Sequence, residues 1–288
     1  MTIDFHTHLL PPHLHRGHPS VERDRTLATL FPPGASDSRT HPRKGMASAE
    51  ELVRDMDAQG IEVSVALGYG WCDPGLARET NDYLLDAARR FPGRVIPFCS
   101  VNPCWGRQAA AEMERCAALG ARGVGELHPD TQGFDPGNAA TMGPMMEAAQ
   151  AHGLMVLVHS SEPVGHDYPG KGRTTPEVLL RFIINFPQAT IVCAHWGGGL
   201  PFYALMPEVR RAMTNVYVDT ASSLLLYQSQ VWPAVARMLG PDKILFGSDY
   251  PLATPGRMLR QVEETLPDAG ERQRILHDNA AALLRLRR

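Results

Sequence analysis

The chain has 288 residues, of which 43% are hydrophobic and 20% are charged, and its net charge is −3 at pH 7. The length suits one large globular domain or two small ones, and the charge excludes a global basic field that would hold nucleic acid or an anionic membrane. No apolar run approaches the roughly 20 residues that span a bilayer, and the N-terminus lacks the pattern of a secretory signal. Nucleic acids and membranes are therefore not expected as partners.

The cysteines indicate a reducing compartment. They are five in number, which is odd, and they are scattered at positions 72, 99, 104, 116 and 193 without C-x-x-C spacing. A disulfide framework would need paired cysteines, and a thiolate metal site would need close spacing. The sequence therefore predicts reduced thiols and a cytoplasmic protein.

The N-terminal run "IDFHTHLLPP", residues 3–12, predicts a buried first strand. Alternation along a strand would place His6 and His8 on one face, with Phe5 and Thr7 facing the other layer. Two adjacent buried imidazoles need a shared partner, and a metal ion is the simplest candidate. The segment 10–47 that follows is rich in proline and histidine and predicts a long inserted loop over the functional face.

Strands and helices alternate through the rest of the chain. Amphipathic helical patterns fall at 48–60, 76–91, 107–120, 139–152, 174–187 and 271–286. Apolar, β-rich runs fall at 63–69, 94–101, 123–129, 154–160, 190–196, 215–222 and 243–251. Eight strands at this spacing predict an α/β protein with a single-domain (β/α)8 TIM barrel over residues 1–288. An open doubly wound sheet is the alternative, but the Gly-rich phosphate loop that it uses after its first strand is absent.

Polar residues occur where the predicted strands end, which is where a TIM barrel carries its site. They are His6, His8, Glu126, His128, His159, His195 and Asp249. Nitrogen and carboxylate donors without thiolate predict a site for zinc, and such donors also suit manganese, iron or cobalt. Asp4 and Asp219 are candidates to hold the second ring nitrogen of a ligating histidine, or to support the barrel.

The order H-x-H, Glu, His, His, Asp on successive strands resembles the amidohydrolase superfamily of metal-dependent hydrolases. Within it, "DFHTHLLPP", "IVCAHWGGGLPFY", "KILFGSDYP" and the closing "ILHDNAAALLRL" resemble the amidohydrolase-2 (aminocarboxymuconate-semialdehyde decarboxylase-like) group. The resemblance covers most of residues 3–286 but not the loop 10–47. The run "GVGELHP" departs from that group and is more similar to TatD-type hydrolases, where a glutamate on this strand bridges two metals.

The resemblance implies a divalent-metal cofactor of one or two ions, and Zn²⁺ is the preferred candidate. His6, His8 and Asp249 would hold the first ion. His159 and His195 would hold the second, and Glu126 would bridge the two. Without the bridge the site would be mononuclear, and His195 would orient water or substrate. Asp249 and His195 are the expected catalytic residues, with Asp249 as the general base for a metal-activated water.

Several residues near the same strand ends are candidates to contact the substrate. Trp71 follows the second predicted strand, and His128 shares the direction of Glu126. Tyr168 and Lys171 lie in the long loop after the fifth strand, where a lysine suits a substrate carboxylate. Trp196 lies beside His195, either in the pocket or outside the barrel.

Four functions follow from these patterns. The first expectation is hydrolysis of a small carbonyl substrate, such as an amide, lactone, lactam or ester. The second is metal-dependent, non-oxidative decarboxylation of a small unsaturated or aromatic acid. A TatD-like nuclease or phosphoesterase is the third, and a non-enzymatic barrel with a structural ion is the fourth. For the first two functions the partner is a small molecule, no nucleic acid is expected, and a homo-oligomer is compatible with the sequence.

Overall fold

Eight parallel strands form the centre of the molecule, and each strand hydrogen-bonds to the next in chain order. The computed structural model describes residues 1–15, 18–31 and 46–286. The strands are β1 (Ile3–His8), β2 (Val63–Leu67), β3 (Val95–Cys99), β4 (Gly123–Leu127), β5 (Met155–Val158), β6 (Ile191–Cys193), β7 (Val216–Asp219) and β8 (Ile244–Leu245). The chain after β8 closes the ring against β1, because Phe5 N donates to Phe246 O and His8 N to Tyr250 O, both at 2.7 Å. The predicted TIM barrel is confirmed.

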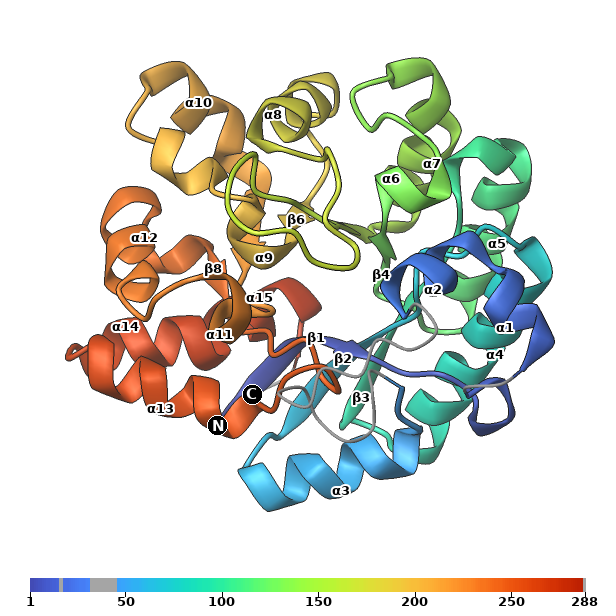
Figure 1. Ribbon diagram of the computed structural model, residues 1–288, viewed down its shortest axis with the longest axis horizontal. Coiled ribbons are helices and arrows are strands. Elements are labelled where there is room, and N and C mark those ends of the chain that lie inside the picture. The colour runs from blue at the N-terminus through green and yellow to red at the C-terminus, as the bar shows by residue number, and fades with distance from the viewer. Residues whose placement is uncertain (16–17, 32–45, 287–288) are drawn as a thin grey trace.

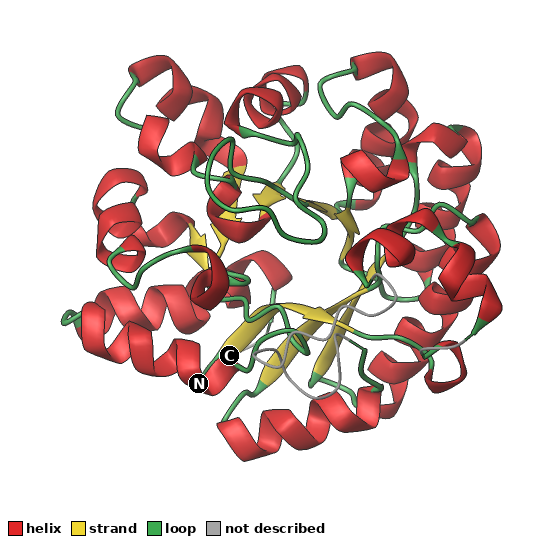
Figure 2. Cartoon of the chain, in the orientation of Figure 1, coloured by secondary structure: helices red, strands yellow, loops and turns green. Residues whose placement is uncertain are grey.

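Helices surround the strands on the outside (Figures 1 and 2). The longer ones are α3 (Ala49–Gln59), α4 (Pro74–Arg90), α5 (Arg107–Ala118), α7 (Ala139–His152), α8 (Pro176–Asn185), α12 (Val231–Leu239) and α13 (Pro255–Thr265). Short helices are α6 (Pro129–Gln132), α9 (Ala194–Gly197), α10 (Pro207–Ala212), α11 (Ser223–Leu226), α14 (Ala269–Gln273) and α15 (Asn279–Leu284). No helix in the described ranges has the length and apolar character to cross a bilayer.

Apolar side chains fill the interior of the barrel, and polar groups line its mouth at the C-terminal ends of the strands. Phe5 and Phe98 pack edge to face in the interior, with ring centroids 5.8 Å apart. Ala280 and Leu284 of α15 belong to the same buried cluster. The barrel is thus packed solid beneath the ends of the strands, which leaves the C-terminal mouth as the place for chemistry.

A β-bulge corrects the predicted alternation of β1. The pairing of β1 with β2 shifts register between Asp4 and Thr7. Phe5 therefore joins the interior cluster, although strict alternation placed it on the face opposite His6. A bulge inserts one extra residue and re-aims the side chains that follow it. Neighbouring residues Phe5 and His6 can consequently both point inward, one into the apolar interior and one toward the mouth.

The inserted segment is partly helical in its described residues, which corrects the expectation of an irregular loop. It contains a 3₁₀ turn (Pro12–Leu14), α1 (Pro19–Arg23) and α2 (Arg25–Leu30). Residues 16–17 and 32–45 of the predicted loop lie outside the described residues. Asp24 is buried and fixes this segment to the barrel: it caps α2 through Thr26 N (2.9 Å) and also accepts from Cys72 N (2.9 Å) and Asp73 N (3.1 Å).

Candidate active site

The two histidines of β1 meet Asp249 at the C-terminal mouth of the barrel. The Nε2 atoms of His6 and His8 lie 3.1 Å apart. Asp249 Oδ1 lies 3.7 Å from His6 Nε2 and 3.5 Å from His8 Nε2. All three side chains are buried. The structure thus brings together the three residues that the sequence assigned to one ion.

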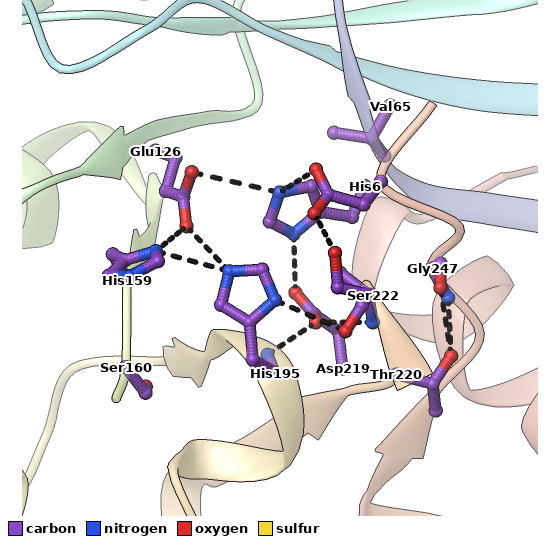
Figure 3. Close-up of polar contacts among 12 residues, drawn as sticks. His6, Val65, Glu126, His159, Ser160, His195, Asp219, Thr220, Ser222 and Gly247 are labelled. Carbon is purple, nitrogen blue, oxygen red and sulfur yellow. Dashed lines mark hydrogen bonds and ion pairs between the residues drawn. The ribbon is translucent and has the colours of Figure 1, made fainter. Parts of the chain in front are cut away.

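Glu126 joins this group to a second pair of histidines (Figure 3). One of its oxygens, Oε2, lies 3.8 Å from His6 Nε2 and 3.5 Å from His8 Nε2. The other, Oε1, lies 2.9 Å from His159 Nδ1 and 3.3 Å from His195 Nε2. A single carboxylate therefore faces both donor groups, one oxygen to each.

Three of the four imidazoles have their outer nitrogen held by an acceptor. His6 Nδ1 lies 2.8 Å from Asp219 Oδ2, and His8 Nδ1 lies 3.2 Å from the carbonyl oxygen of Gly68. His195 Nδ1 lies 3.1 Å from the carbonyl oxygen of Ala221. A neutral imidazole that donates through Nδ1 presents an unprotonated Nε2. If both rings of β1 are neutral, as they would be with a cation bound, their two Nε2 lone pairs face the place where that cation would lie.

The charges around the cluster are strongly coupled. Burial alone lowers the pKa of His6, but the charges of Asp219, Glu126 and Asp249 outweigh it and raise that pKa to about 9. Burial likewise opposes protonation of His195, and the hydrogen bond and charge of Glu126, with Asp249, raise its pKa to about 10. The pKa of Asp249 is lowered, because contacts with the histidines outweigh its burial. The site therefore balances buried carboxylates against protons on imidazoles, and a bound cation can replace those protons.

Local backbone geometry aims these side chains. His195 and Trp196 have φ values of 55° and 57°, in the left-handed region, directly after β6. This turn directs His195 to the centre, while Trp196 packs in the layer between the barrel and α12. Gly247 passes so close to β1 that a Cβ on it would lie 2.8 Å from His6 Cβ. A glycine at this position is thus needed for His6 to occupy its place.

The donor set fits a divalent cation on the structure's own geometry. Two triads of buried residues each bring their donor atoms within 4.8 Å of one another. One triad is His6, His8 and Asp249, and the other is His6, Glu126 and His195. His159 Nδ1 lies 3.1 Å from His195 Nε2, which places a further nitrogen at the second triad. Imidazole and carboxylate donors suit zinc, manganese and iron alike.

The predicted substrate contacts divide into two groups. His128 stacks on His159 with ring centroids 4.0 Å apart, so it lies beside the donors. Tyr168, in the loop after β5, donates through its hydroxyl to Glu162 Oε2 at 3.0 Å. Trp71 is fully buried under the inserted segment and packs edge to face on Tyr69. Tyr69 in turn stacks on His8 at 4.7 Å, so these aromatic residues form one wall beside the donors.

Two of the predicted substrate contacts have structural partners instead. The indole of Trp196 donates to Ser223 Oγ at 2.6 Å and packs on Trp232, with no exposed surface. The left-handed turn at His195 is the reason, since it sends the next side chain outward. The ammonium of Lys171 donates to the carbonyl oxygens of residues 164, 165 and 166 in its own loop. Because an ammonium has three donors, Lys171 has none left for a substrate carboxylate.

Sequence reasoning missed one side chain of the site. Ser222 donates through Oγ to Asp249 Oδ2, and it adopts a left-handed φ of 58° to do so. No motif marks a serine three residues after a strand as such a partner. Asp219 was weighed as a support for a histidine, and it contacts His6 directly. Asp4 accepts from the backbone amides of His6 (3.3 Å) and Ser248 (2.8 Å) at the site.

The chain belongs to the amidohydrolase family (Amidohydro_2), whose model matches residues 3–286. This confirms the family to which the sequence motifs pointed. Among curated relatives, the 6-methylsalicylic acid decarboxylase of Penicillium expansum is 26% identical, and the match covers 98% of this chain and 94% of the relative. The gamma-resorcylate decarboxylase of Polaromonas sp. is 23% identical over 83% of this chain and 88% of the relative.

A solved structure gives the same picture of the fold. It is a 5-carboxyvanillate decarboxylase from Novosphingobium aromaticivorans in complex with manganese and 4-hydroxy-3-methoxy-5-nitrobenzoic acid. The TM-score is 0.77 at 19% identity, and the match covers 99% of this chain and 96% of the other. The expectation of hydrolysis is wrong, because two of the curated relatives and several of the solved structures of this fold are decarboxylases of aromatic acids. Glu126 on β4 had favoured hydrolysis, since a bridging glutamate is the mark of two-metal hydrolases.

Proposed function

We propose that this protein is a metal-dependent, non-oxidative decarboxylase of a small aromatic acid. The observation that carries the proposal is the set of inward-facing imidazole nitrogens whose outer nitrogens are already held, as His6 is by Asp219 and His8 by the Gly68 carbonyl. This is the arrangement that metal-binding histidines require. The aromatic-acid decarboxylases among the relatives supply the reaction class.

His6, His8 and Asp249 would hold the principal cation, with Glu126 Oε2 beside them. Glu126 Oε1, His159 and His195 would hold a second ion if Glu126 bridges. Manganese is present in the related carboxyvanillate decarboxylase, so manganese stands beside zinc as the candidate metal. When bound, the cation would supply positive charge to orient the acid and to stabilise negative charge that develops on it.

In the proposed reaction the bond between the ring carbon and the carboxylate breaks, carbon dioxide leaves, and the ring carbon takes up one proton. The protein must therefore position the acid, keep bulk water away and deliver a proton. Asp249 and His195 are the proposed proton-handling residues, because both lie at the donors and neither is exposed. Ser222 Oγ donates to Asp249 Oδ2, which leaves Asp249 Oδ1 on the side of His6 and His8. A reaction that needs no attacking water suits a site this enclosed.

The test is direct. Purified protein is stripped with a chelator and reloaded separately with Mn²⁺ and Zn²⁺. It is then assayed for carbon dioxide release from 2,6-dihydroxybenzoate, 6-methylsalicylate and 5-carboxyvanillate. Metal-dependent release from one of these acids, lost in the Asp249→Asn variant, is the expected result. Absence of release from every acid, with the metal content intact, would refute the proposal.

The same assay separates the catalytic role of Asp249 from its role in holding metal. Asn can still offer an oxygen to the cation but cannot carry the proton. Asp249→Asn should therefore lose turnover while it retains most of the metal. His8→Ala is the matched variant, since it should lose metal and turnover together. A wild-type rate in Asp249→Asn would eliminate the proton-handling role.

A further inference from the structure

One imidazole beside the site has no hydrogen-bond partner on either nitrogen. His128 follows β4, is 2% exposed, and neither its Nδ1 nor its Nε2 has a partner in the described part of the chain. A buried polar atom without a partner costs about 1–3 kcal/mol. The fold nevertheless keeps a histidine here, although leucine has similar bulk and no such cost. A partner that arrives from outside the chain would remove this cost.

The position of His128 is tightly held. Its backbone N donates to Gln132 Oε1 at 2.9 Å. The amide nitrogen of Gln132 donates to the carbonyl oxygens of Trp71 (3.0 Å) and Val101 (2.9 Å), so the ends of three strands are tied together. Gly70 packs against the ring's base, since a Cβ on it would lie 2.8 Å from His128 Cβ. The ring cannot readily turn away to find a partner elsewhere.

The ring lies between the donors and the covering segments. One face stacks on His159, with the ring planes 20° apart. A Cβ built on Gly170 would lie 3.6 Å from His128 Nε2 and 2.6 Å from Leu30 Cδ2. The loop after β5 and α2 of the inserted segment thus meet above Nε2. A molecule bound at the donors and beneath these segments would lie within reach of this nitrogen.

We propose that His128 Nε2 makes a hydrogen bond to a ring hydroxyl of the aromatic acid and so selects hydroxylated substrates. This inference rests on the proposed function and assigns the specificity of the same site. A neutral imidazole can donate from one nitrogen and accept at the other, and a hydroxyl can do both, so the two groups match. A carboxylate would instead be drawn to the cation. A buried polar atom that a substrate hydroxyl satisfies penalises an analogue without that hydroxyl, because the atom is then left unpaired.

The experiment compares variants of His128 on two acids that differ only in the ring hydroxyl. His128→Leu removes both nitrogens, His128→Gln places an amide near the position of Nε2, and His128→Asn places one near Nδ1. His152→Leu, on the exposed C-terminal turn of α7, is the control. For each metal-loaded protein, KM and kcat are measured for both acids. The Kd of 2-nitroresorcinol, an aromatic inhibitor that carries two ring hydroxyls, is measured as well, together with the metal content and the Tm.

We expect His128→Leu to raise KM for the hydroxylated acid and the Kd of 2-nitroresorcinol by about 10-fold or more, and to leave KM for the acid without the hydroxyl unchanged. His128→Gln should restore part of the loss, and His128→Asn should restore less. Metal content and the control should match wild type. If all three variants discriminated between the two acids as wild type does, the role of His128 would be refuted, but the proposed function would stand. A wild-type protein that decarboxylates no aromatic acid would instead overturn the proposed function, and this inference with it.

Discussion

The contact between Asp219 and His6 permits a sharp prediction about metal binding. Asp219 is completely buried and accepts three hydrogen bonds. Its Oδ1 accepts from the backbone N of His195 and of Ala221, both at 3.0 Å, and its Oδ2 lies 2.8 Å from His6 Nδ1. In Asp219→Asn the amide oxygen can keep both backbone bonds. The amide NH₂ would replace Oδ2, so it would meet the N–H of His6 donor against donor.

In the metal-bound state His6 would be neutral, and it could relieve this clash only by moving its proton from Nδ1 to Nε2. That nitrogen faces His8 Nε2 at 3.1 Å, so its lone pair would no longer be available to a cation. Loss of such a supporting contact typically lowers metal affinity 10- to 100-fold, which is about 1.4–2.7 kcal/mol. The fold should survive, since two of the three hydrogen bonds of Asp219 remain.

Asp4→Asn is the matched control. Asp4 is equally buried but accepts from backbone amides at the site, and burial raises its pKa to about 6 in spite of these bonds. An amide there should therefore leave metal affinity within about 2-fold of wild type, because the protonation of the imidazole nitrogens that face the metal site stays the same. Isothermal titration of chelator-treated protein with Mn²⁺ measures both variants, and circular dichroism checks the fold. Wild-type affinity in Asp219→Asn would refute the reasoning on the proton of His6.

Four further predictions follow from the geometry. Glu126→Gln should hold one metal ion fewer per chain than wild type in elemental analysis, and equal contents would show that Glu126 does not bridge. Asp24→Ala should free the inserted segment locally at a cost of about 1–3 kcal/mol, seen as faster proteolysis within 18–31 and a raised KM, whereas unchanged proteolysis would remove its anchoring role. Trp196→Phe should lose about 1–3 kcal/mol of stability with KM unchanged, and a raised KM would show that Trp196 contacts the substrate after all. Because the pKa values of His6 and His195 are raised to about 9 and about 10, their stabilisation of the metal-free fold is complete below about pH 6.5 and is lost as the pH rises through those values. Calorimetry with chelator should show Tm falling from about pH 7 to about pH 10, and a flat profile would contradict these shifts.

Decarboxylation and hydrolysis could not be separated from the residues alone. Both reactions use imidazole and carboxylate donors at the ends of barrel strands, and one fold hosts many chemistries. Glu126 was read as a bridge and therefore as a mark of hydrolysis. The structure gives it contacts to both donor groups, and the relatives point to decarboxylation, so the bridge and the reaction are separate questions.

The sequence by itself determined the barrel and predicted which residues would gather at its mouth as candidate metal donors. Strand and helix periodicity are local properties, and the rule that sites lie at strand ends then located His6, Glu126, His159, His195 and Asp249 without coordinates. Local patterns determine these features because the chain order of a (β/α)8 barrel is also its spatial order.

Only the tertiary structure decided where side chains aim and what holds them. A bulge in β1 puts Phe5 and His6 on the inner side together, and a left-handed turn at His195 sends Trp196 outward. The carbonyl of Gly68 that holds His8 comes from a different strand's end and has no signature in side-chain identity. The unpartnered ring of His128 is likewise visible only once every neighbour is in place. Hydrogen bonding is settled by three-dimensional distances and angles, and these depend on contacts between residues far apart in the chain.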